Sequence, residues 1–119
     1  MKKNVEDLII YKQFLELIYY MENICEKYPK SEKNSLVATI KNVTYESLKD
    51  VIKAFKVYEK DNKLKYLNDL DSNLKFLKVL IRISYRKKYI NKKNYEAWSR
   101  KIANIGNLLG GWILSCVKA

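Results

Sequence analysis

The side chains of this sequence best suited to chemistry are basic, and they gather in one window. Residues 82–101 contain eight Lys and Arg side chains and a single acid, Glu96. All three arginines of the chain lie there, and a guanidinium gives phosphate bidentate contacts that an ammonium cannot give. The window, with one basic position just before it, predicts a nucleic-acid-binding surface made by Lys78, Arg82, Arg86, Lys87, Lys88, Lys92, Lys93, Arg100 and Lys101.

The spacing of these residues supports the same interpretation. Lys78, Arg82 and Arg86 follow one another at intervals of four, so a helix stacks them in one exposed stripe. Aromatic residues interleave with the charges and offer stacking faces to unpaired bases: Tyr85, Tyr89 and Tyr95. In the alternative interpretation, the tyrosines cover the end of the fold and the charges only keep the protein in solution.

The overall charge also bears on partners and on catalysis. The chain has 24 Lys and Arg against 13 Asp and Glu, a net charge of +11, which favours a polyanionic partner such as RNA or DNA over a merely compositional bias. The absence of histidine excludes His-dependent acid–base catalysis and imidazole metal sites. We therefore expect no enzyme activity, no cofactor and no metal. The acidic residues are predicted to lie largely on polar helix faces: Glu6, Asp7, Glu16, Glu22, Asp50, Asp69 and Asp71.

Apolar periodicity predicts the helices that position these residues. Side chains recur at intervals of three and four over residues 5–27, 36–58, from 64 to about 84, and 95–116, the last with Asn91 as N-cap. The third and fourth segments carry heptad seams, which predict an antiparallel helix pair. The seams consist of Leu67, Leu70, Leu74, Leu77, Ile81 and Ser84, and of Tyr95, Trp98, Ile102, Ile105, Leu109, Trp112 and Cys116. The sequence thus predicts an all-α, up-down-up-down four-helix bundle in one domain, residues 1–119.

The three glycines of the chain, Gly106, Gly110 and Gly111, all lie in the fourth segment. A glycine inside a helix costs about 1 kcal/mol relative to alanine. Three explanations remain open from the sequence: a tight helix crossing, a kink, or a partner surface beside Trp112. Fifteen aromatic side chains exceed what four helices comfortably bury, which predicts a homo-oligomer. No apolar run approaches the ~20 residues of a membrane span, so we expect a cytoplasmic protein without a membrane partner.

The order of these segments resembles a known family. YPKSEKNSL (28–36), LKFLKVLIRIS (74–84) and IGNLLGGWI (105–113) are similar to segments of the accessory variability determinant (Avd) proteins of diversity-generating retroelements. Four-helix proteins encoded in ribosomal intervening sequences share the last of these segments. The family's basic positions, spaced L-R-x-x-L-R, fall on Leu77, Lys78, Ile81 and Arg82.

The resemblance implies a small, basic, non-catalytic bundle that assembles as a pentamer. It implies binding to the retroelement's reverse transcriptase and to its RNA, in support of mutagenic cDNA synthesis and retrohoming. In a ring of bundles, Gly106, Gly110, Gly111 and Trp112 would lie where helices of neighbouring protomers approach closely. An intervening-sequence-type bundle without a reverse transcriptase partner, and a purely structural helical module, are the two alternatives.

Overall fold

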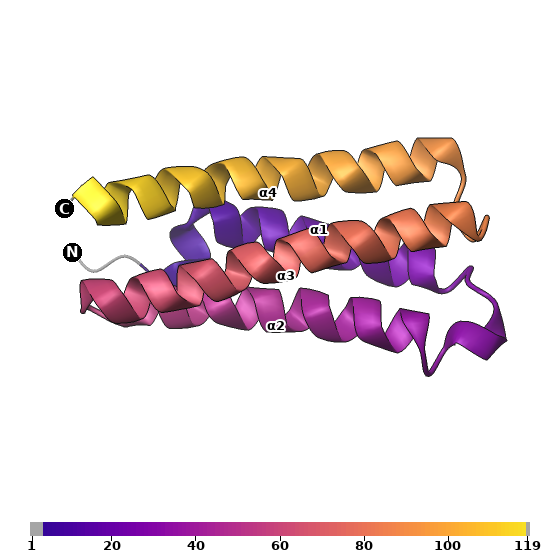
Figure 1. Cartoon of the computed structure of the whole chain (residues 1–119), viewed down its shortest axis with the longest axis horizontal. Coiled ribbons are helices and arrows are strands. Elements are labelled where there is room, and N and C mark those ends of the chain that lie inside the picture. Colours follow the sequence, from indigo (N-terminus) through magenta and orange to yellow (C-terminus); the bar gives the residue numbers. More distant parts are fainter. Residues whose placement is uncertain (1–3, 119) are drawn as a thin grey trace.

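Four long helices account for most of residues 4–118, which the computed structural model describes. They are α1 (Ile9–Cys25), α2 (Leu36–Lys56), α3 (Lys60–Arg86) and α4 (Lys92–Lys118); short 3-10 turns, η1 (Val5–Asp7) and η2 (Lys30–Glu32), precede α1 and α2. Successive helices run antiparallel and α4 returns beside α1, so that each helix packs against two neighbours (Figure 1). The described residues form no strand. The predicted all-α four-helix bundle is confirmed.

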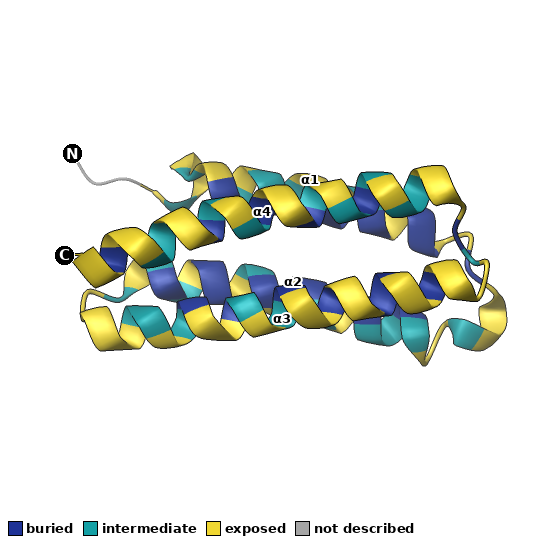
Figure 2. Cartoon of the chain, turned by 45° about the horizontal axis from the view of Figure 1, so that its top comes forward, coloured by how far each residue is buried: buried dark blue, intermediate teal, exposed yellow. Residues whose placement is uncertain are grey.

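The two predicted seams form the part of the core that α3 and α4 contribute. Figure 2 shows buried positions recurring along the inner side of each helix. Large apolar side chains at intervals of three and four bring these two helices together along their length. All six seam residues of α3 are buried, and so are Trp98, Ile102, Ile105, Leu109 and Cys116 of α4, whereas Tyr95 and Trp112 are half-buried.

Several helix boundaries differ from the prediction, and three of them are informative. α1 begins at Ile9 rather than at residue 5, because the backbone at Leu8 is extended. α2 ends at Lys56, two residues early. α3 begins at Lys60 rather than at residue 64, inside the polar run 59–63. Helical backbone extends into polar residues there, where apolar periodicity carries no signal.

The prediction for Asp50 is wrong, because this residue is buried rather than on a polar face. Its side chain is 4% exposed between α2 and α3, and its Oδ2 accepts a hydrogen bond from Asn73 Nδ2 at 3.1 Å. Burial raises the pKa of the Asp50 carboxyl to about 6, and the negative charges of Asp69 and Glu46 act in the same direction. An acid that ionises near neutrality therefore lies inside the α2–α3 contact.

Candidate nucleic-acid interface

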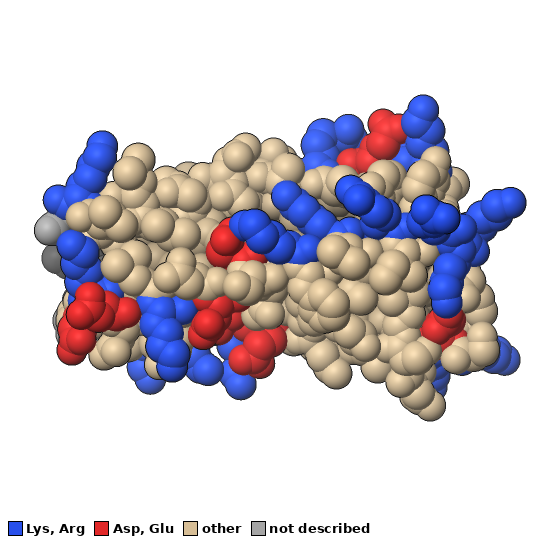
Figure 3. Space-filling model, in the orientation of Figure 1, with Lys and Arg blue, Asp and Glu red and all other residues tan. Residues whose placement is uncertain are grey.

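The predicted basic stripe lies on the exposed side of α3. Lys78, Arg82 and Arg86 are all exposed and follow one another turn by turn. Within residues 4–118 none of the three forms an ion pair, whereas Lys75 is neutralised by Asp71 at 2.7 Å. Figure 3 shows Lys and Arg side chains in a row over α3, in the half of the molecule that leads to the α3–α4 turn. The row is an uncompensated positive surface.

The turn after α3 continues this surface with a strained residue. The Tyr89 N–H donates to the Ser84 carbonyl and the Lys88 N–H to the Tyr85 carbonyl, both at 3.0 Å. This pair of bonds is the Schellman pattern, whose left-handed position is usually glycine. Here that position is Lys88, with a φ of 65°. A side chain in this conformation costs about 1 kcal/mol, so the turn retains a lysine at the expense of stability.

Glu32 connects η2 to the same turn. Its carboxylate accepts hydrogen bonds from the Ser35 hydroxyl at 2.6 Å and the Tyr89 hydroxyl at 2.7 Å, and Lys87 Nζ lies 3.5 Å away. The pKa of the Glu32 carboxyl is lowered to about 2. The hydrogen bond from Ser35 contributes most to this shift, the hydrogen bond from Tyr89 contributes next, and the Lys87 charge contributes less. Lys87 is therefore partly neutralised. Tyr89 also packs on Tyr28, with ring centroids 5.4 Å apart, and its ring is not free to stack on a base.

The other two predicted stacking residues contact each other. The rings of Tyr85 and Tyr95 lie 4.6 Å apart and within 7° of parallel. Tyr95 is half-buried against the core, whereas Tyr85 is 37% exposed. Of the three tyrosines, Tyr85 alone is exposed beside the basic stripe.

The basic residues of α4 do not all join the stripe. Asn91 caps α4 as predicted, since its Oδ1 accepts the Asn94 N–H at 2.8 Å. Lys92 pairs at 3.9 Å with the one acid of the window. Lys93 and Arg100 are exposed and, being seven residues apart, lie on the same side of the helix. Lys101 faces α1 instead, where its Nζ lies 5.3 Å from the centroid of the Tyr20 ring.

The glycines of α4 have no packing role within this chain. A Cβ placed on Gly106, Gly110 or Gly111 would meet no atom of the described residues 4–118 within 4 Å, and none of the three has a positive φ. The explanation by a tight helix crossing inside the bundle is therefore wrong. Trp112 is half-buried and borders, with Leu108 of α4 and the start of α1, a pocket of about 360 Å³. A partner surface remains as an explanation for the glycines.

Sequence reasoning missed an apolar strip on the exposed side of α3. Phe76, Val79 and Ile83 are 46%, 51% and 37% exposed. Their intervals of three and four are visible in the sequence, but the strip runs beside the core seam and has the same spacing, so the sequence did not distinguish it from core residues.

Sequence reasoning also missed a lysine-lined pocket at one end of the bundle. Within residues 4–118, no three metal-ligating side chains converge and no helix is long and apolar enough to cross a membrane.

Known proteins resemble this chain in sequence and in fold. The model of a family described as bAvd-like matches residues 8–116. A solved structure from Bacteroides thetaiotaomicron VPI-5482, a protein with unknown function from the S23 ribosomal protein family, superposes with a TM-score of 0.81. That likeness covers 88% of this chain and 95% of the other at 16% identity, which supports the fold alone. No curated protein matches the chain.

Proposed function

This chain belongs to the bAvd-like family, and on that premise we propose that it is a non-catalytic, nucleic-acid-binding accessory protein of a diversity-generating retroelement. In this role it acts in the cytoplasm, binds RNA and also DNA, and binds the element's reverse transcriptase to support mutagenic cDNA synthesis and retrohoming. The observation that carries the nucleic-acid part is the unpaired stripe of Lys78, Arg82 and Arg86 on α3.

The energetics of the stripe support a bound anion. Like charges one turn apart on a helix repel each other by a few tenths of a kcal/mol per pair. Lys88 adds a strained backbone at the end of the same row. Both features lower the stability of the free protein, and a phosphate backbone offsets the repulsion when it binds. Lys93 and Arg100 on α4 extend the proposed interface. Lys101 contributes less to phosphate binding, because its ammonium group lies over the Tyr20 ring.

The proposal includes a homo-oligomer, with a pentamer favoured by the family. Gly106, Gly110 and Gly111 leave the backbone of α4 open to a second protomer beside Trp112. Large apolar side chains are exposed elsewhere on the bundle, among them Ile9, Phe76, Val79, Leu114 and Val117. A ring of protomers repeats the basic stripe and so presents several phosphate-binding surfaces to one strand. Light scattering at micromolar concentration should give a multiple of 14.2 kDa; a monomer throughout that range would contradict the assembly.

RNA binding is tested by removing the stripe and comparing the result with an equal loss of charge elsewhere. Lys78, Arg82 and Arg86 are replaced together by Gln; in the control, the exposed Lys12, Lys49 and Lys56 of α1 and α2 are replaced by Gln. Each single-strand phosphate contact contributes about 0.7 to the slope of log K against log salt, so the stripe variant should lose about 2 from the slope and bind about 10- to 100-fold more weakly at 0.1 M salt.

Fluorescence anisotropy with a single-stranded RNA, at several salt concentrations, measures both quantities. Circular dichroism and light scattering should show the same helicity and mass for the parent and both variants. If the stripe variant and the control bind RNA equally well, the stripe is only a solvated face and the nucleic-acid role fails.

The protein partner is tested separately, by purifying the chain from its host with RNA retained. We expect a reverse transcriptase to co-purify. Its loss on ribonuclease treatment shows that RNA mediates the contact, and its retention shows that the two proteins bind each other directly. If none co-purifies while RNA binding persists, the chain acts instead as an intervening-sequence-type bundle.

A further inference from the structure

A pocket at one end of the bundle has features that the stripe does not explain. It lies between the end of α1 and the start of α2 and has a volume of about 220 Å³. Pockets that hold drug-sized molecules occupy about 300–1,000 Å³, so this one accommodates a single ring system. We call it the end pocket.

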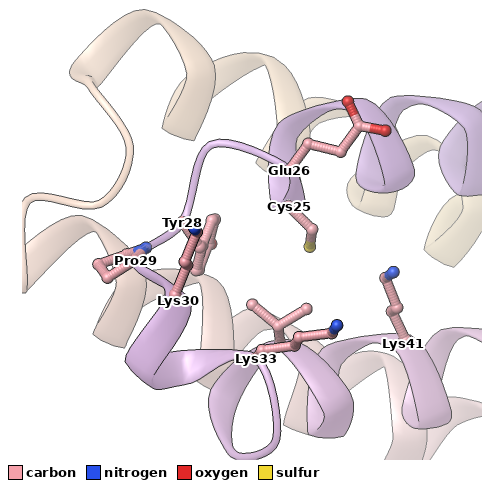
Figure 4. A pocket seen from close by; sticks show the side chains of 8 residues that line it. Cys25, Glu26, Tyr28, Pro29, Lys30, Lys33 and Lys41 are labelled. Atoms are coloured by element: carbon pink, nitrogen blue, oxygen red, sulfur yellow. The ribbon is translucent and has the colours of Figure 1, made fainter.

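The walls of the end pocket are partly apolar and partly cationic. Cys25, Tyr28, Pro29 and Val37 supply the apolar part, and Lys30, Lys33 and Lys41 supply the cationic part. In Figure 4 the Cys25 sulfur and the amines of Lys33 and Lys41 point into the same space, while the carboxylate of Glu26 points away from it.

The three lysines of the end pocket lack partners. Within residues 4–118, none of Lys30, Lys33 and Lys41 forms an ion pair or donates a side-chain hydrogen bond. The N-terminal end of α2 also borders the pocket, through Val37. The Ser35 side chain, at the N-cap position, makes no capping bond, and its hydroxyl donates to Glu32. Uncapped N–H groups add to the preference for an anion that the lysines create.

The position of the end pocket relates it to the basic stripe. The α1–α2 connection and the α3–α4 turn lie at the same end of the molecule (Figure 1). Glu32, in the connection, bonds to Tyr89 and Lys87 of the turn. A strand that follows the stripe along α3 toward Lys88 therefore arrives at the end where the pocket opens.

We propose that the end pocket holds one unpaired nucleotide of a strand bound along the stripe. The base packs against Cys25, Val37 and Pro29, and its phosphate contacts the ammonium groups of Lys33 and Lys41. This inference rests on the proposed nucleic-acid function. It adds a site that contacts the base of one nucleotide as well as its phosphate.

The first test asks whether the pocket binds a nucleotide. Amide NMR signals of Cys25, Val37 and Lys41 are followed while uridine, inorganic phosphate or uridine monophosphate is added to the full chain. We expect saturable shifts with the monophosphate, at an affinity at least about 10-fold above that of phosphate or uridine. Equal binding of phosphate and monophosphate overturns the role of the base. No saturable shift with the monophosphate overturns the site.

The second test asks whether the nucleotide comes from a strand. Lys33→Gln with Lys41→Gln is compared with a control pair that removes the same charge away from the pocket, Lys12→Gln with Lys49→Gln. The pocket pair should bind a 20-nucleotide oligouridine at least about 5-fold more weakly than the control pair. If the two pairs bind it equally while the monophosphate still binds, the site takes a free nucleotide and the strand assignment is wrong.

The stripe variant separates failure of the pocket from failure of the proposed function. Replacing Lys78, Arg82 and Arg86 should weaken oligouridine binding and leave the monophosphate shifts unchanged, because the pocket is intact. If that variant loses the oligouridine while the parent shows no monophosphate shifts, the nucleic-acid function stands and the pocket inference falls.

Discussion

Replacing the glycines of α4 by alanine should stabilise an isolated chain and weaken its assembly. A methyl group at Gly106, Gly110 or Gly111 meets no atom within 4 Å in the part of the chain that the structure describes, and no positive φ opposes it. Alanine is favoured over glycine in a helix interior by about 0.8–1 kcal/mol per residue. Because the difference in helix propensity applies to each residue separately, the triple variant should gain about 2–3 kcal/mol of unfolding free energy. For a chain of this length that corresponds to an increase of about 10 °C in Tm.

Urea unfolding and light scattering, each over a range of protein concentrations, test both parts of this prediction. At concentrations where only monomer is present, the variant should unfold at higher urea than the parent. At higher concentrations, its mass should remain closer to 14.2 kDa than that of the parent, because three methyl groups now occupy the contact. Asn104→Ala, at an exposed position of the same helix, is the control: it should gain a few tenths of a kcal/mol and leave the mass unchanged.

Two outcomes would refute the reasoning. A monomeric triple variant that is less stable than the parent would mean that the open space beside α4 is filled within one chain. An unchanged assembly with the full gain in stability would mean that the glycines do not lie at a protomer contact, and the kink would be the explanation left for them.

Two further substitutions test features of the fold. Asp50→Asn should raise the unfolding free energy at pH 7.5 by up to about 3 kcal/mol. The Asp50 pKa is about 6 in the folded chain, above its ordinary value, so its protonated form stabilises the native state fully below about pH 4 and this stabilisation is lost as the pH rises through 6. The amide of Asn carries no charge at either pH and keeps the stabilisation. Urea unfolding at pH 4.5 and 7.5 measures it, and an equal pH dependence in the parent and the variant would contradict it. Lys88→Gly should gain about 1 kcal/mol in unfolding free energy by relieving the left-handed backbone, while the salt slope of single-stranded RNA binding falls by about 0.7. A variant that is no more stable than the parent would show that the turn carries no strain.

The core was predictable because its residues obey one period. Every α3 seam residue from Leu67 to Ser84 is buried, because side chains at intervals of three and four share one face of a helix and that apolar face packs into the core. The end of each helix was less predictable. The start of α3 at Lys60 lies in polar residues and has no side-chain cap; a contact with α4 forms there instead, since Lys60 Nζ donates to the Val117 carbonyl at 3.2 Å.

The candidate site was predictable on one helix and not between helices. The exposure of Lys78, Arg82 and Arg86 follows from their spacing relative to the seam. The engagement of Lys87 and Tyr89 by Glu32 does not, because it joins residues more than fifty positions apart. The end pocket was out of reach for the same reason: Cys25 and Lys41 lie on different helices, and only the folded chain brings them together.

The departures from what stability alone favours concentrate on the α3–α4 hairpin. The like-charge stripe, the left-handed Lys88 and the open glycines each lower the stability of the isolated chain, and no contact among the described residues offsets any of them. The buried residues of α1 and α2 are mostly apolar, with Asp50 as the charged exception. Local conflicts of this kind persist at functional surfaces, where a partner supplies the missing interaction. The proposed interactions with nucleic acid and with other protomers therefore both fall on this hairpin, whereas α1 and α2 pack against it and form the end pocket with their connection.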